Sequence, residues 1–133
     1  MPNFINMKYQ HILIVDDDPE DIEIFSEAVL SLNKDITITS STDALLALEN
    51  LKNKADLPDI IFLDLQMPRL TGKDFLEKLN EDSALQNIPV VVLSGQSDVI
   101  IKDLYQKIGA RNYICKPNSY KELVEELREI LYS

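Results

Sequence analysis

The sequence predicts an α/β fold in which a doubly wound parallel sheet carries helices on both faces. Five short apolar runs alternate with five segments whose apolar residues recur at helical spacing. Most of the runs are rich in Ile and Val and lack polar alternation, as is typical of parallel strands buried on both sides. Strictly alternating strands and helices, joined by right-handed crossovers, form a sheet of this kind.

The five apolar runs are the predicted strands. They are His11–Val15, Ile36–Thr39, Ile60–Leu63, Ile88–Leu93 and Asn112–Cys115. The second run alternates between apolar and polar residues, so one of its faces is expected to be exposed. We therefore place the second strand at an edge of the sheet.

The segments between the runs each carry one apolar stripe, which predicts helices that bury one side. The stripes begin with Ile22, Leu45, Phe75, Ile101 and Leu123. Asp18-Pro19 has the form of an N-cap followed by proline, and Ser119–Glu122 has the form of a capping box. Gly109 stands where the fourth helix needs a C-cap.

Length and composition indicate one globular domain. The chain has 133 residues, of which 45% are hydrophobic and 27% charged. We assign residues 1–9 to an N-terminal extension and residues 10–133 to the domain. The formal net charge of −10 argues against direct nucleic-acid binding, because the affinity for phosphate backbones comes largely from Lys and Arg.

The remaining bulk features favour a reducing, cytoplasmic location. Cys115 is the only cysteine and His11 the only histidine, so the sequence predicts neither an internal disulfide nor a zinc site. We expect Cys115 to be a buried strand residue. No apolar stretch approaches the roughly 18 residues that are needed to span a bilayer.

Polar residues follow four of the five predicted strands. These residues are Asp16-Asp17-Asp18, Asp64, Ser94-Gly95 and Lys116-Pro117. Functional residues of doubly wound sheets lie beyond the carboxyl ends of the strands. The sequence therefore predicts a site where several carboxylates meet one lysine and one serine.

Neighbouring carboxylates repel one another unless a cation lies between them, and Mg²⁺ prefers oxygen ligands. An aspartate beside Mg²⁺ can attack an activated phosphorus, which makes Asp64 the candidate nucleophile. Lys116 and Ser94 can then contact phosphoryl oxygens. The alternative interpretation is that these acids are helix caps, Ser94 a turn residue and Lys116 a solvated cation. For Asp18 alone we favour the cap.

Five motifs in this sequence together resemble the receiver domain of two-component response regulators, and they extend over nearly the whole chain. The motifs are Ile14–Asp18, Leu63–Pro68, Gly72, Leu93–Gly95 and Tyr113–Pro117. The resemblance implies a flavodoxin-like (βα)₅ fold with strand order 2-1-3-4-5.

The resemblance also assigns roles in the site. It implies that Asp64 is the phospho-acceptor and that Asp16, Asp17 and Asp64 bind Mg²⁺ together with the backbone carbonyl of Gln66. Ser94 and Lys116 would contact the phosphoryl group.

In this family the hydroxyl residue moves toward the phosphoryl group and an aromatic residue of the fifth strand rotates inward. Tyr113 occupies that position, although it could also be an ordinary half-buried strand aromatic. The face spanning residues 97–131 would then change its affinity for partners. We further expect a cis peptide bond between Lys116 and Pro117, and a close backbone approach at Gly72.

The favoured hypothesis is that the protein is a phosphorylation-activated switch and not an enzyme that turns over a substrate. The protein would catalyse its own phosphorylation and its own dephosphorylation. It would take its phosphoryl group from a histidine kinase or a phosphotransfer protein. We expect no output domain, and therefore action through an unknown downstream protein, through a homodimer, or as a relay or phosphate sink. An aspartyl phosphatase and a phosphorylation-independent binding module are the alternatives.

Overall fold

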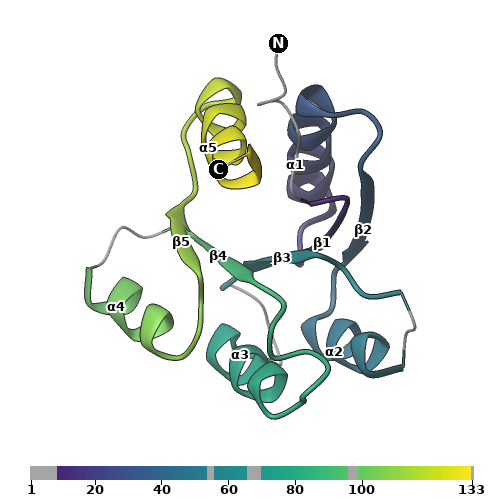
Figure 1. The fold of residues 1–133 in the computed structure, drawn as a ribbon. Helices are drawn as coiled ribbons and strands as arrows, with labels where there is room; N and C mark the ends of the chain where they lie inside the picture. Colours follow the sequence, from purple (N-terminus) through teal and green to yellow (C-terminus); the bar gives the residue numbers. More distant parts are fainter. Residues whose placement is uncertain (1–8, 54–55, 66–69, 96–98, 133) are drawn as a thin grey trace.

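The computed structural model describes residues 9–53, 56–65, 70–95 and 99–132. The described residues form a parallel sheet of five strands in the order β2-β1-β3-β4-β5 (Figure 1). The strands are β1 (His11–Val15), β2 (Thr37–Ser41), β3 (Ile60–Asp64), β4 (Val90–Ser94) and β5 (Asn112–Cys115). This order confirms the predicted flavodoxin-like fold.

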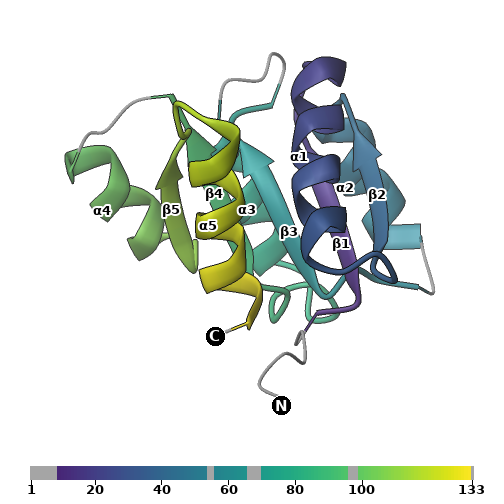
Figure 2. The same ribbon diagram turned by 90° about the horizontal axis from the view of Figure 1, so that it is seen from above.

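Five helices cover the sheet. They are α1 (Pro19–Leu32), α2 (Ala44–Asn53), α3 (Gly72–Asn80), α4 (Val99–Lys107) and α5 (Tyr120–Tyr132). Helices α1 and α5 lie side by side on one face, and α2, α3 and α4 lie on the other (Figures 1 and 2). None of the helices within the described ranges is long and apolar enough to cross a membrane.

Each face of the sheet has its own apolar core. Under α1 and α5, Phe25 packs on Phe62 with ring centroids 4.8 Å apart. Under the other three helices, Phe75 and Leu76 lie in a cluster with alternate residues of the central strands. All five residues of β3 and of β4 are buried, as their uninterrupted apolar runs predict.

The predicted position of the second strand is confirmed, since β2 is an edge strand of partly exposed residues. The expectation that Cys115 is buried is wrong, because its side chain is exposed. It belongs to β5, the other edge strand, beside which α4 supplies no fully buried residue. An apolar run in the sequence therefore does not by itself show that the side chains of an edge strand are buried.

The predicted N-cap at Asp18 is confirmed, and so is one of the two hydrogen bonds of the predicted capping box at Ser119. The carboxylate of Asp18 accepts a hydrogen bond from the Glu20 backbone N–H at 2.9 Å. The Ser119 hydroxyl accepts one from the Glu122 N–H at 3.2 Å. Both contacts satisfy donors of a first helical turn that have no partner within the helix.

Gly109 ends the turn after α4 and gives a testable prediction. Its φ of +116° is a conformation that side chains disfavour, and a Cβ there would lie 3.1 Å from Asn80 Nδ2. We expect Gly109→Ala to lower the free energy of unfolding by about 1–2 kcal/mol, measured by urea denaturation. Asn80 also donates to the Ile108 carbonyl, so the double variant is compared with Asn80→Ala alone, which separates backbone strain from the contact. A Gly109→Ala change without effect on stability in either background would contradict this account.

Candidate functional site

Three buried polar side chains meet at the carboxyl edge of the sheet. Asp16 follows β1, while Asp64 and Ser94 end β3 and β4. Their exposed fractions are 4%, 2% and 5%. Strand register brings them together, because Val15 pairs with Leu63 and Asp64 pairs with Leu93. The structure therefore places these predicted residues in one site.

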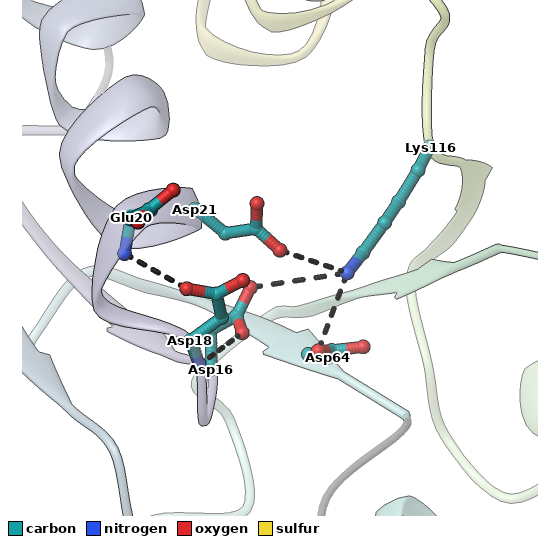
Figure 3. A network of polar contacts seen from close by, with 6 residues as sticks. All are labelled: Asp16, Asp18, Glu20, Asp21, Asp64 and Lys116. Carbon is teal, nitrogen blue, oxygen red and sulfur yellow. Dashed lines mark hydrogen bonds and ion pairs between the residues drawn. The ribbon is translucent and has the colours of Figure 1, made fainter.

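Lys116, directly after β5, reaches across the sheet edge to these acids (Figure 3). Its Nζ lies 3.3 Å from Asp64 Oδ2, 3.6 Å from Asp21 Oδ2 and 3.9 Å from Asp16 Oδ2. Burial by itself lowers the pKa of this ammonium, but the carboxylates of Asp64, Asp16 and Asp21 outweigh it and raise the pKa. Lys116 therefore stays charged at neutral pH.

The Asp16 carboxylate has an unusual protonation equilibrium. Burial, with a further contribution from the charge of Asp64, raises its pKa from 3.8 to about 7. The backbone N–H of Asp18, which donates to Asp16 Oδ1 at 3.0 Å, and the Lys116 ammonium oppose that rise. A positive charge beyond Lys116 would therefore be needed to keep Asp16 fully ionised at neutral pH.

Asp17 joins Asp16 and Asp64 in a group that fits a divalent cation. One carboxylate oxygen of each residue lies within 4.8 Å of the other two, with Asp17 exposed and the others buried. All three donors are hard oxygens, which Mg²⁺ prefers, and the raised pKa of Asp16 indicates a demand for positive charge. The proposed ligand Gln66 lies outside the described residues.

The sequence did not single out Asp21, which pairs with Lys116 from the first turn of α1. The sequence does contain an indication that Asp21 lies near the site. Asp18 caps α1, and the first turn of a helix that starts directly after β1 must lie near the end of that strand. Asp18 itself contacts the Glu20 N–H, as expected of a cap. Tyr113 is half-buried on β5.

The expected cis bond between Lys116 and Pro117 is wrong, since no peptide bond among the described residues is cis. A peptide bond before proline accommodates either isomer within about 1 kcal/mol, so the motif alone does not decide between them. The expected close approach at Gly72 is present. A Cβ there would meet the Leu65 side chain and would lie 3.3 Å from Tyr105 Cε1.

A hollow of about 330 Å³ opens beside the site between α1 and the segment that joins β5 to α5. Asp16, Asp21 and Lys116 line it, together with apolar side chains that include Ile24 and Leu123. The hollow makes the edge of the acidic site accessible from outside.

The family model for the response regulator receiver domain matches residues 12–128. Among curated relatives, the transcriptional regulatory protein CseB of Streptomyces coelicolor is 34% identical over 91% of this chain. The alignment covers 49% of CseB, so this chain spans about half the length of that relative.

Two solved structures resemble the whole fold. The phosphorylated cyanobacterial phytochrome response regulator RcpA matches with a TM-score of 0.83 and 27% identity, over 94% of this chain and 95% of RcpA. The Mn²⁺-bound response regulator Rcp1 matches with a TM-score of 0.79 and 25% identity, over 91% of each chain. The motif order, the sheet topology and the family match agree, and the chain belongs to the response regulator receiver domain family.

Proposed function

We propose that this protein is a signalling switch in which Asp64 accepts a phosphoryl group with the help of Mg²⁺. The observation that carries the proposal is the buried Asp64 carboxylate, 3.3 Å from the Lys116 ammonium and grouped with Asp16 and Asp17. Receiver domains accept phosphoryl groups from histidine kinases or phosphotransfer proteins. We assign that donor class to this chain.

In the proposed reaction, an Asp64 oxygen attacks the phosphorus of the donor. The new O–P bond forms as the bond from phosphorus to the donor breaks, and the electron pair leaves with the donor. Lys116 pairs with one phosphoryl oxygen, and the Ser94 hydroxyl donates to another. Asp16, Asp17, Asp64 and the Gln66 carbonyl would hold Mg²⁺, which supplies charge neutralisation at the phosphoryl oxygens. Water later hydrolyses the acyl phosphate and resets the switch.

The output surface in this proposal is the face formed by α4, β5 and α5. Apolar side chains are well exposed there, with exposed fractions of 72% for Val99, 79% for Ile100 and 47% for Tyr120. Movement of Ser94 and Tyr113 on phosphorylation would alter this face and with it the affinity for a downstream protein or a second copy. The net charge of −10 disfavours nucleic acid as the direct partner. We place this activity in the cytoplasm.

The similar structures support both chemical parts of the proposal. RcpA was solved in a phosphorylated form and Rcp1 with Mn²⁺ bound. Both ions, Mn²⁺ and Mg²⁺, suit carboxylate and carbonyl oxygens.

Intact mass after incubation with acetyl phosphate tests the proposal. We expect a gain of one phosphoryl group, roughly 80 Da, in the presence of Mg²⁺ and no gain with excess EDTA. Cold quenching preserves the labile acyl phosphate. Sustained turnover of a phosphomonoester would instead favour the phosphatase. No adduct, and no change in the protein on adding Mg²⁺ and beryllofluoride, would favour the phosphorylation-independent module.

A further inference from the structure

Helix α4 is held against the rest of the domain by few contacts. It has no fully buried residue, and its half-buried apolar side chains are Ile101 and Tyr105, with Ile108 just after it. Polar contacts join it to α3 at two places. Asn80 Nδ2, at the end of α3, donates to the Ile108 carbonyl at 2.9 Å. Tyr105 makes the second contact, at the start of α3.

The Tyr105 hydroxyl accepts a hydrogen bond from the backbone N–H of Lys73. This N–H lies in the first turn of α3 and has no partner within the helix. The Thr71 hydroxyl accepts from the next donor, the Asp74 N–H, at 3.1 Å. Two side chains thus cap the start of α3: Thr71, which directly precedes the helix, and Tyr105 of α4.

The Tyr105 ring is in van der Waals contact with the beginning of α3. A Cβ at Gly72 would lie 3.3 Å from Tyr105 Cε1 and 3.4 Å from its hydroxyl oxygen, so the ring fills the space that the missing side chain leaves. The same Cβ would meet the Leu65 side chain, which directly follows Asp64. Leu65 and Tyr105 therefore both lie against Gly72 at the start of α3.

Tyr105 also contacts the switch aromatic on β5. The ring centroids of Tyr105 and Tyr113 are 6.4 Å apart, with the planes inclined by 38°. This distance lies within the range in which aromatic rings attract each other. Tyr105 thus joins three parts of the molecule: the start of α3, Tyr113 and α4.

We propose that Tyr105 is a positioning residue that transmits a change at Asp64 through the start of α3 to α4. This inference rests on the proposed function and adds a second route to the one through Ser94 and Tyr113. Because the Leu65 side chain lies against Gly72, a displacement of Leu65 beside Asp64 moves Gly72 and the Lys73 N–H, and the phenol bonded to that N–H carries α4 with it. The hydroxyl is the group through which Tyr105 is hydrogen-bonded to α3, so its removal should weaken the coupling between α3 and α4.

Tyr105→Phe tests the proposal, because it removes the hydroxyl and keeps the ring. The matched control is Tyr132→Phe, which removes a hydroxyl that donates to the Leu32 carbonyl at 2.9 Å on the opposite face. Amide exchange by NMR should show Lys73 exchanging about two- to tenfold faster in Tyr105→Phe and unchanged in the control. This readout needs no phosphoryl chemistry.

The second readout is the amide shift change on adding Mg²⁺ and beryllofluoride. In the wild type and in Tyr132→Phe we expect changes both near Asp64 and along α4. In Tyr105→Phe the changes near Asp64 remain, and those of residues 99–107 fall to less than about half. Asn80→Ala, which releases the other end of α4, should reduce the α4 response as well.

Each other outcome overturns the inference in a distinguishable way. Unchanged exchange at Lys73 would show that the hydroxyl does not cap α3. Faster exchange with a full α4 response would show a purely structural contact. A wild type that does not respond at all to beryllofluoride would overturn the proposed function and the coupling together.

Discussion

Asp64→Asn should abolish phosphoryl uptake, so that the mass of the variant remains unmodified after incubation with acetyl phosphate and Mg²⁺. The amide has nearly the same shape as the carboxylate, but it lacks the negative oxygen that attacks phosphorus. Asp64 is 2% exposed and paired with Lys116, so a buried carboxylate is removed without opening a cavity. The variant should therefore stay folded, which circular dichroism can verify.

Asp18→Asn is the matched control for this experiment. It makes the same acid-to-amide change in the same acidic region, but Asp18 contacts the Glu20 N–H instead of Lys116. Asn is as good an N-cap as Asp, so helix α1 should be preserved. The control should gain roughly 80 Da as the wild type does. A phosphoryl adduct on Asp64→Asn would show that another residue is an acceptor.

The fold could be predicted from the sequence because its determinants are local and repeated. The apolar runs that form β3 and β4 are buried on both faces, as short Ile- and Val-rich runs without polar alternation predict. The caps at Asp18 and Ser119 depend on neighbouring residues alone. The meeting of Asp16 and Asp64 then follows from topology, since parallel strands end at the same edge of the sheet.

The features that the sequence did not predict depend on tertiary placement. The exposure of Cys115 follows from the position of β5 at the edge, where the burial of an apolar run depends on what covers it. The pairing of Asp21 with Lys116 depends on how α1 leaves β1. The capping of α3 by Tyr105 joins residues far apart in the sequence, which no local pattern encodes.

Asp16→Asn should stabilise the metal-free protein at pH 8 while weakening its binding of Mg²⁺. Burial raises the Asp16 pKa from 3.8 to about 7 in the folded state, so the folded protein binds an extra proton between these pH values. The contribution of Asp16 to the stability of the metal-free wild type therefore falls as pH rises from about 4 to about 7. Asn avoids this cost and can still accept from the Asp18 N–H through its carbonyl oxygen.

A rise in pKa from 3.8 to about 7 corresponds to at most about 4 kcal/mol, and we expect Asp16→Asn to raise the free energy of unfolding by about 1–4 kcal/mol. Urea denaturation in EDTA at several pH values measures it. Asp64 and Lys116 face Asp16, and the charge of Asp64 raises the Asp16 pKa while that of Lys116 lowers it. The gain should shrink toward zero as pH approaches 4. An equal gain at pH 4 and pH 8 would exclude ionisation of Asp16 as its cause.

Mg²⁺ should reverse the order of stability of the two proteins. A cation that binds only the folded state stabilises it by RT ln(1 + c/Kd), where c is the free cation concentration, so the melting temperature of the wild type should keep rising with Mg²⁺ concentration. Asp16→Asn should lose at least about tenfold in Mg²⁺ affinity and respond little. Asp17→Asn separates the two effects, because Asp17 is exposed and its removal should weaken Mg²⁺ binding without stabilising the metal-free protein. Asp16 would then contribute to Mg²⁺ binding while lowering the stability of the metal-free protein by a measurable amount.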